Sequence, residues 1–388
     1  MNILLIYETK VSVIGGTGTY LREIINGLGR RGHRVYLAFP DYGKEELNPI
    51  TNVTPIPVKV LEDNYRKRTS RFIKKVNELF DTIIKKEGID IVHVIFGWYA
   101  FASVDYTKIR ELGAKPFVTV HNVPPQECME SFDGDDLVHR VKDAVQNLFR
   151  CVRSFFNIQR IDRHTVIIVP CDNVRKRMRR YLSRNRIHVI SHGYNEKLIC
   201  SEKKIDNKTA PEYRILTVAG IAPGKNQKLL IDVVKSVRNK AQMRVYFVGP
   251  VRNQRYCKYL MSYIDCLGLK DVFQFVDSCS DEELVRLYHN CDLYVQPSKH
   301  EGFCMAALDA AAFGMAVIGS DVGELKRISE LSGGISPQYN NVDDYVKAIK
   351  HIIFNPVEGQ ERKKYAEAIR NKYNWDNSCE KLDELYRI

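Results

Sequence analysis

Two acidic residues, Glu301 and Asp309, stand eight residues apart around the start of a predicted helix. The preceding residues, 298–302, are capping and flexible types, so the first amides of the helix should point at whatever lies above its N-terminus. Amides and helix dipole together favour a pyrophosphate there. The expected pyrophosphate-binding site comprises Gly302, Phe303, Cys304 and Met305. Eight helical residues span about 12 Å, so one acid could bind sugar hydroxyls and the other ribose hydroxyls. A capped amphipathic helix with two unrelated acids is the alternative.

A histidine and a lysine also follow predicted strands. His121 comes directly after the strand Pro116–Val120, and Lys225 follows a strand that ends at Gly220. Ligands of open parallel sheets bind beyond the carboxyl ends of the strands, so both side chains should face a ligand, with Lys225 as a point charge for phosphate. A structural histidine and a solvated lysine are the ordinary alternatives. Further candidates for contacts to the same ligand are Asp277 and Ser278.

A glycine-rich segment, residues 15–20, opens a helix after the first predicted strand. Glycines there, Gly16 among them, let backbone amides approach a phosphate, although a structural turn is an alternative. The dinucleotide fingerprint is incomplete because residue 21 is leucine, which disfavours a nicotinamide or flavin site. The Asp-x-Asp at Asp133–Asp135 follows no hydrophobic strand, so we interpret it as an acidic loop. No metal site is expected.

Short β-branched runs alternate with helical stretches in two series, which predicts two doubly wound parallel sheets in an α/β fold. The first series is Ile3–Tyr7, Val35–Phe39, Ile89–Ile95, Pro116–Val120, Thr165–Val169 and Ile187–Ile190, and the second is Arg214–Ala219, Arg244–Val248, Phe273–Val276, Leu293–Gln296 and Ala316–Gly319. A polar stretch separates them, so the predicted domains are 1–195 and 213–374, joined by a linker at 196–212. Residues 375–388 form a predicted helix that could pack on either domain, including back on the first.

The composition excludes several classes of protein. The chain has 388 residues, more than one hydrophobic core usually holds, with 44% hydrophobic and 27% charged residues, so collagen-like and disordered chains are excluded. No run of 18 apolar residues occurs and no basic residue precedes the first apolar run, so neither a spanning helix nor a signal peptide is expected. The ten cysteines include no Cys-x-x-Cys pair, which fits reduced thiols in the cytoplasm.

The net charge of +12, from 59 basic and 47 acidic residues, should attract polyanions. Basic residues gather at 64–75 and 175–186, and the first of these stretches leads into an apolar helical pattern typical of interfacial helices. A third candidate contains Phe149, Phe155 and Phe156 among arginines. Peripheral contact with an anionic inner membrane face is therefore an option, and solvated or core helices are the alternative. Nucleic acid is not expected, because no recognised binding module accompanies the charge.

Taken together, these segments resemble the retaining, family-4 glycosyltransferases with the B-type, two-Rossmann-domain fold. The resemblance extends over nearly the whole chain, and its parts come in the family's order. The similar segments are Gly15–Gly16 with the helix ending near Gly32, Val118–Asn122, Val189–Asn195, the Glu-x7-Glu-like Glu301–Asp309, and Ser320–Glu324. The resemblance implies two domains that face each other across a cleft, the first binding the acceptor and the second the nucleotide sugar.

The resemblance also implies roles for matching residues. Glu301 would bind hydroxyls of the transferred sugar, Asp309 the ribose, and the amides after Gly302 the diphosphate. His121 would lie beside the anomeric centre, Gly16 near the phosphates or acceptor, and Lys225 beside the leaving diphosphate. Catalysis would thus fall to His121, Glu301 and Lys225.

Three positions depart from the family pattern. Gly220 stands where the family usually has an arginine, so half of a cationic pair is missing, and Arg252 or Arg255 could replace it. Asp309 is one methylene shorter than the usual glutamate, and Val322 replaces one glycine of a glycine pair. His192 also stands where the family prefers asparagine.

We therefore expect a hexosyltransferase that moves a hexose, with retention, from a nucleotide diphosphate sugar to a hydroxyl of a saccharide or lipid-linked acceptor. It would take part in the synthesis of an envelope polysaccharide or glycolipid and would need neither a metal nor another cofactor. A nucleotide-sugar epimerase of the same fold and a non-catalytic nucleotide-sugar-binding protein are the alternatives.

Overall fold

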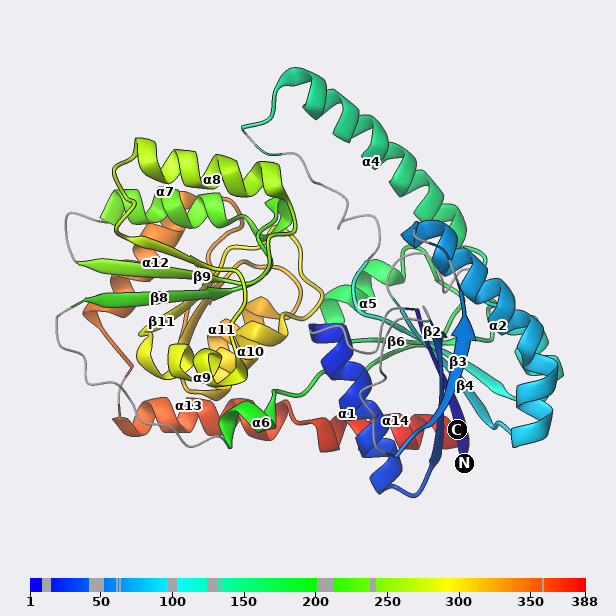
Figure 1. Ribbon diagram of the computed structural model, residues 1–388. Helices are drawn as coiled ribbons and strands as arrows, with labels where there is room; N and C mark the ends of the chain where they lie inside the picture. Colours follow the sequence, from blue (N-terminus) through cyan, green and yellow to red (C-terminus); the bar gives the residue numbers. More distant parts are fainter. Residues whose placement is uncertain are drawn as a thin grey trace. The chain divides into compact units, whose positions relative to one another are not determined.

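The computed structural model describes residues 1–8, 15–41, 52–60, 62, 64–96, 103–123, 132, 134–200, 212–237, 242–357 and 359–388. The chain forms two compact units. The first contains residues 1–125, 148–192 and 375–388, and the second contains residues 126–147 and 193–374. Both units are α/β folds built on a parallel sheet (Figure 1).

In the described part of the first unit the sheet has seven strands in the order β3-β2-β1-β4-β5-β6-β7. They are β1 Asn2–Tyr7, β2 Arg34–Asp41, β3 Thr54–Lys59, β4 Ile91–Phe96, β5 Lys115–Val120, β6 Val166–Val169 and β7 Ile187–Val189. The central strands are buried along nearly their whole length, because helices cover both faces of a parallel sheet. The helices are α1 Gly16–Arg30, α2 Tyr65–Glu87, α3 Tyr106–Glu111, α5 Asp172–Met178 and α14 Trp375–Arg387. Helix α4, Leu137–Ile158, is shared, because its residues 137–147 belong to the second unit and the rest to the first.

The edge strand β3 is one element that the sequence pattern did not predict. Its sequence, Thr-Pro-Ile-Pro-Val-Lys, contains two prolines, which normally argue against a strand. Pro55 and Pro57 are tolerated because β3 pairs on one side only, in parallel with β2. An edge strand does not need every N–H for a ladder.

In the described part of the second unit the sheet has five strands in the order β10-β9-β8-β11-β12, the arrangement of a Rossmann-like half. They are β8 Tyr213–Val218, β9 Met243–Val248, β10 Phe273–Val276, β11 Leu293–Gln296 and β12 Ala316–Gly319. The helices are α6 Glu196–Ile199, α7 Gln227–Val237, α8 Gln254–Cys266, α9 Asp281–Asn290, α10 Met305–Ala312, α11 Leu325–Leu331, α12 Val342–Phe354 and α13 Gly359–Lys372. Figure 1 shows α7 and α8 on one side of this sheet and α9 and α10 on the other.

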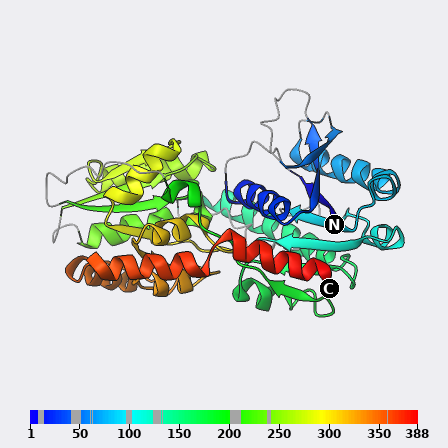
Figure 2. The same ribbon diagram turned by 90° about the horizontal axis from the view of Figure 1, so that it is seen from below.

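The C-terminal helix α14 belongs to the first unit, although 182 residues of the second unit, 193–374, precede it in the chain. It packs against α1, and the two helices lie side by side in Figures 1 and 2. The packing is close, since a Cβ on Gly27 of α1 would collide with the Cys379 side chain. His33 and Asp383 add a hydrogen bond of 2.8 Å. The first unit is therefore completed by the end of the chain.

Of the four places where the chain passes from one unit to the other, the one nearest the predicted linker falls between His192 and Gly193. Of the predicted linker, 196–212, the first four residues form α6, and residues 201–211 lie outside the described residues.

The apolar side of α2, predicted as a candidate membrane contact, is part of the core. Phe72, Ile73, Val76 and Phe80 are all buried. These side chains are therefore not available to a membrane, and the basic residues of 64–75 that the structure describes decorate the outer side of a core helix. None of the helices in the described residues combines the length and the apolar character needed to cross a membrane.

Candidate active site

Lys225 and Glu301, both predicted as site residues, meet beyond the carboxyl ends of β8 and β11 in the second unit. The Lys225 Nζ lies 2.6 Å from the Glu301 Oε1. Lys225 ends a 3-10 turn, Pro223–Lys225, and the amide of Lys299 donates to the carbonyl of Gly224 at 2.9 Å, which fixes the two loops to each other. The lysine side chain is about one third exposed and the glutamate is buried. A cation and an acid are thus held together at the edge where ligands of such sheets bind.

A chain of buried hydrogen bonds positions Glu301. Its Oε1 accepts from the Ser298 hydroxyl at 2.8 Å, and Ser298 in turn accepts from the Gln296 amide at 2.7 Å. The side-chain oxygen of Gln296, Oε1, accepts a hydrogen bond from the Tyr294 hydroxyl at 2.9 Å. Within the described residues, both hydrogen bonds to the Glu301 carboxylate use Oε1, which leaves Oε2 for a hydroxyl of a ligand. Sequence reasoning missed Tyr294, Gln296 and Ser298, although they alternate along and just beyond one strand.

Gly323 explains how the loop before α10 keeps its shape. Its φ is +56°, and a Cβ on it would lie 2.5 Å from the Glu301 carbonyl oxygen and 2.8 Å from that of Gly302. Only glycine combines this left-handed conformation with such close approach. The turn after β12 therefore supports the Glu301–Gly302 backbone directly. Its neighbour Val322, which replaces a glycine of the family pattern, is buried.

Helix α10 begins at Met305, the last of the four residues predicted to bind pyrophosphate. Cys304 precedes it with φ 70°, a conformation rare for residues other than glycine. The first turn of α10 is half-buried, whereas the following residues, Ala307–Ala312, are buried. The N-terminus of the helix thus reaches the edge of the unit, and its dipole favours an anion there. Burial raises the pKa of the Cys304 thiol well above its ordinary value.

Asp309 lies inside α10 and is buried. Its Oδ1 accepts a hydrogen bond of 2.8 Å from the backbone amide of Asn195. Burial raises the pKa of this carboxyl from 3.8 to about 7, against the opposing effect of the Asn195 hydrogen bond. The structure therefore gives Asp309 a positioning contact with the segment that re-enters the second unit at Gly193, which its predicted ribose role did not include.

The side chain of Arg252 fills the space beside Gly220. A Cβ on Gly220 would lie 2.8 Å from the Arg252 Cγ. The amide of Arg252 donates to the Ile221 carbonyl at 3.1 Å, so the loop after β9 is anchored to the loop after β8. Within the described part of the chain, no carboxylate lies within ion-pair distance of Arg252, whereas Arg255 binds Asp135 at 3.1 Å. Of the two arginines named as substitutes for the missing family arginine, Arg252 is the one beside Gly220.

Asp277 and Ser278 follow β10 and are exposed at the same carboxyl edge. The Asp277 Oδ1 accepts from the amide of Val251 at 3.1 Å. Asp277 thus holds the loop that carries Arg252.

In the first unit, His121 lies beyond the carboxyl end of β5 in a cluster of aromatic rings. Its Nδ1 lies 3.2 Å from the Nε2 of His192, and its ring meets Tyr20 edge-on at 4.7 Å. His192 stacks on Trp375 at 5.9 Å. Desolvation lowers the pKa of His121 from 6.5 to about 4 and that of His192 well below its ordinary value, so both imidazoles are neutral at pH 7. Sequence reasoning missed Trp375, which is 183 residues from its partner and carries no local signal.

Gly16 is the first residue of α1, and Gly15 precedes it without a side-chain cap. Gly15, Gly16 and Thr17 are exposed, so this helix start reaches the surface of the first unit beyond β1. The arrangement agrees with the predicted open glycine turn.

The acidic loop before α4 has a structural role in the second unit. The Asp135 side chain is buried and pairs with Arg255, and Asp136 Oδ1 accepts from the amide of His139 at 2.8 Å, which caps α4. Asp133, the first acid of the Asp-x-Asp, lies outside the described residues. Among the described residues, no three His, Cys, Asp or Glu side chains are placed to hold a metal ion.

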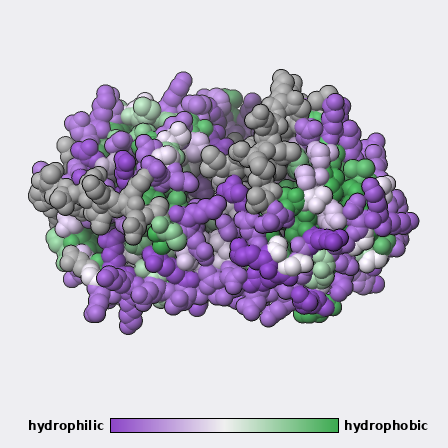
Figure 3. All heavy atoms as spheres, turned by 60° about the horizontal axis from the view of Figure 1, so that its bottom comes forward, coloured by the Kyte–Doolittle hydropathy of each residue, from purple (hydrophilic) through white to green (hydrophobic). Residues whose placement is uncertain are grey.

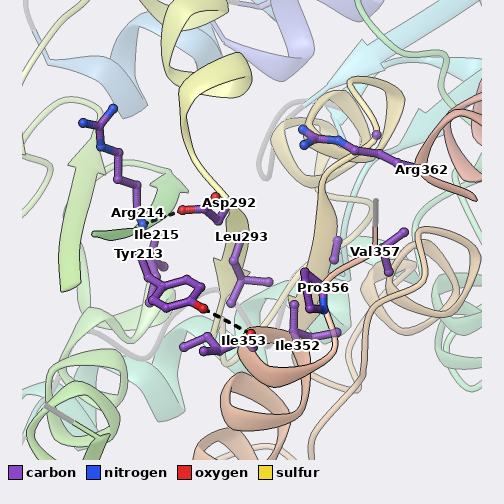
Figure 4. A pocket seen from close by; sticks show the side chains of 12 residues that line it. Tyr213, Arg214, Ile215, Asp292, Leu293, Ile352, Ile353, Pro356, Val357 and Arg362 are labelled. Carbon is purple, nitrogen blue, oxygen red and sulfur yellow. Dashed lines mark hydrogen bonds between the residues drawn. The ribbon is translucent and has the colours of Figure 1, made fainter. Parts of the chain in front are cut away.

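One well-formed pocket of the second unit lies away from these residues, at the opposite edge of the sheet. Figure 4 shows it between the first residues of β8 and β11 and the end of α12. Arg214 donates its amide to Asp292 at 2.9 Å, and the Tyr213 hydroxyl donates to the Ile353 carbonyl at 3.3 Å. Because this is the amino edge of the strands, we do not assign the pocket to the site.

Two Rossmann-like parallel-sheet units, with a cation and an acid at the start of a helix beyond the strand ends, define a glycosyltransferase of the B type. Residues 14–198 match the family described as "Glycosyltransferase Family 4", and residues 201–374 match "Glycosyl transferases group 1". The two matches together cover almost the whole chain. The protein belongs to this glycosyltransferase family.

Individual relatives agree with this assignment. The chain is 25% identical over 410 residues to the serotype-specific mannosyltransferase WbdA of Escherichia coli, a match that covers 96% of the chain but only 46% of WbdA. The solved structure of sucrose-phosphate synthase from Thermosynechococcus elongatus is similar with a TM-score of 0.79 at 19% identity, covering 100% of this chain and 98% of that one. HepE of Anabaena, solved with UDP and glucose, has a TM-score of 0.71 at 16% identity, covering 99% of each chain. At these identities the solved structures show the fold.

Proposed function

We propose that this protein is a retaining hexosyltransferase that uses a nucleotide diphosphate sugar as donor. The acceptor is a hydroxyl of a saccharide or lipid-linked saccharide, in the synthesis of an envelope polysaccharide or glycolipid. The mannosyltransferase among its relatives supports a hexose, and the UDP complex of HepE supports a nucleotide donor. The second unit binds the donor and the first unit binds the acceptor.

The Lys225–Glu301 pair carries this proposal. A lysine and a buried glutamate 2.6 Å apart at the N-terminus of α10 provide a cation for phosphate and an acceptor for sugar hydroxyls. The buried relay through Ser298 and Gln296 holds the acid in one orientation. A merely structural ion pair would not need such support beside a helix N-terminus.

In the proposed reaction the bond between the anomeric carbon and the diphosphate oxygen breaks, and negative charge develops on that oxygen. Lys225, Arg252 and the amides at the start of α10 stabilise this charge, which is the largest catalytic contribution available to the chain. The acceptor oxygen forms its bond to the anomeric carbon on the same face, and its proton passes to the leaving phosphate oxygen. To His121 of the first unit we assign the role of a neutral hydrogen-bond partner of the reacting sugar, since its lowered pKa leaves the ring without a charge at pH 7.

The donor is tested by thermal shift of the purified chain against uridine and guanosine diphosphate sugars. A ligand that binds only the folded state raises the Tm. One sugar nucleotide should raise the Tm of the natural chain and of Lys228→Ala, which removes a lysine paired with Asp232 on α7. Lys225→Ala should lose most of this shift. An unchanged shift in Lys225→Ala would contradict the proposed site.

Transfer itself is tested with the donor so identified and a panel of saccharide acceptors. Release of nucleoside diphosphate that depends on acceptor, with the anomeric configuration retained in the product, is expected. Activity should persist with a chelator, since the proposal places the stabilising charges on side chains and amides. Conversion of the donor sugar without acceptor would favour an epimerase. Binding without any turnover would favour a non-catalytic binding protein.

We also propose that the protein works at the cytoplasmic face of a membrane, to which it binds peripherally. The net charge of +12 and one exposed helix support this.

A further inference from the structure

Helix α4 turns an apolar side to solvent along its whole length. Of the thirteen exposed large hydrophobic side chains in the described residues, nine belong to it. They are Leu137, Val138, Val141, Val145, Leu148, Phe149, Val152, Phe155 and Phe156. Phe149 is 70% exposed and Phe156 is 62% exposed. The face drawn in Figure 3 is ordinary by comparison, mostly hydrophilic with scattered hydrophobic patches. A soluble protein rarely exposes so long a continuous apolar strip without a partner.

The spacing shows that this strip is one face of the helix. At 3.6 residues per turn, all nine side chains fall within an arc of about 120°, and the 22 residues of α4 extend about 33 Å. Ser154 and Ile158, which are buried, lie outside the arc. The helix therefore packs on the protein through a different side and leaves its apolar arc to another partner. Figure 1 shows α4 as one uninterrupted helix.

The charges on α4 indicate what this partner is. The helix carries Arg140, Lys142, Arg150 and Arg153 but a single acid, Asp143, whose carboxylate lies 3.7 Å from Arg255. On the helical projection Lys142 and Arg153 border the apolar arc. Basic residues beside an apolar arc are typical of helices that lie in an anionic membrane interface. Pairing with a second copy would instead bring equal positive rows together, which is unfavourable.

We propose that α4 lies flat in the headgroup region of an anionic membrane, with its apolar arc inserted and with Lys142 and Arg153, which border the arc, toward the lipid phosphates. The inference rests on the proposed function in one respect, because it assigns the surface through which the enzyme reaches a lipid-linked acceptor. The binding itself needs neither donor nor transfer.

The test measures sedimentation of the full chain with vesicles of about equal parts phosphatidylglycerol and phosphatidylcholine, compared with phosphatidylcholine alone. The natural chain should bind the anionic vesicles and dissociate at high salt. The triple variant Leu148→Ser/Phe149→Ser/Phe156→Ser should bind at least about tenfold more weakly. The matched control Met261→Ser/Phe354→Ser removes exposed hydrophobic side chains from α8 and α12 and should bind as the natural chain does.

Insertion is read separately from the fluorescence of a Phe149→Trp variant. Its emission should shift to the blue with anionic vesicles and stay unchanged with neutral ones. Equal vesicle binding by the natural chain and the triple variant would overturn the proposal. So would a natural dimer that the triple variant loses while neither protein binds vesicles, which would make α4 a self-association face. The thermal shift with sugar nucleotides is unaffected in every case, so failure here is distinct from failure of the proposed function.

Discussion

The Cγ of Arg252 lies where a side chain on Gly220 would begin, since a Cβ there would be only 2.8 Å away. The backbone of Gly220 is not left-handed, so any residue can adopt its conformation. The two positions therefore compete for one space at the carboxyl edge of β8. This geometry explains how the chain lacks the arginine usual at position 220 and still places a guanidinium there.

Exchanging the two residues tests this relationship. Arg252→Ala should weaken sugar nucleotide binding by about tenfold or more, because a charged hydrogen bond to phosphate is lost. Gly220→Arg alone should crowd Arg252, whereas Gly220→Arg/Arg252→Ala should recover most of the affinity. Isothermal titration with the donor measures all three.

Arg255→Ala is the control for the exchange, because Arg255 binds Asp135 and not the Gly220 backbone. Its donor affinity should match that of the natural chain. If the double variant binds no better than Arg252→Ala, the two positions do not supply the same charge.

Gly323→Ala should damage the donor site and the stability of the second unit together. The left-handed φ of +56° costs an alanine about 1–2 kcal/mol, and its Cβ would strike the Glu301 and Gly302 carbonyl oxygens. We expect a Tm lower by several degrees and weaker donor binding, both measured by thermal shift. Gly224→Ala is the matched control, because a Cβ there meets nothing within 4 Å and its φ is ordinary. If Gly323→Ala behaves like this control, the turn at Gly323 does not support the Glu301–Gly302 backbone.

Most strands could be predicted from sequence because parallel strands buried on both faces appear as short β-branched runs. The start of α10, Lys225 and His121 were predicted for a related reason, since the carboxyl ends of those strands fix where a site can lie. The edge strand β3 could not, because its prolines are acceptable only once its neighbours are known. Contacts between segments far apart in the chain, such as His192 with Trp375, could not be predicted either, because they produce no periodic pattern in the sequence.

The two amphipathic helices show a second limit. Both α2 and α4 combine an apolar stripe with basic residues, and this pattern made each of them a candidate for membrane contact. In α2 the stripe is core, and in α4 it is exposed. Periodicity defines the arc of a helix but not what covers it, which depends on the packing of the whole unit.

Asp309 should make stability depend on pH in a specific direction. Its folded pKa of about 7 is above the ordinary 3.8, so the folded state holds the proton more tightly than the unfolded state does. Its contribution to stability is full below about pH 4 and is lost as pH rises through 7, a difference of about 4 kcal/mol. Asp309→Asn keeps an oxygen for the Asn195 amide but cannot ionise.

The Tm of Asp309→Asn should therefore rise relative to that of the natural chain between about pH 4 and pH 8. Asp232→Asn, which loses the ion pair with Lys228 but keeps an oxygen for the Tyr263 hydroxyl, should show no such rise. A constant difference between Asp309→Asn and the natural chain across this range would mean that Asp309 ionises in the folded state as it does in water.

The histidine cluster of the first unit should give the opposite pH dependence. His121 and His192 have folded pKa values below the ordinary 6.5, because burial disfavours the charged ring. The unfolded chain binds protons more readily, so stability is present above pH 6.5 and is lost as pH falls toward the folded value of about 4.

His192→Asn removes one of these buried bases but also the ring that stacks on Trp375. Its Tm should be lower than that of the natural chain at pH 7, and the gap should narrow as pH falls toward about 4.5, because asparagine takes up no proton. The exposed His164, changed to asparagine, is the control and should leave the slope of Tm against pH unchanged. Parallel curves for His192→Asn and the natural chain would show that His192 takes up a proton in the folded state as readily as in the unfolded chain. In that case the lowered pKa attributed to burial of His192 would be wrong.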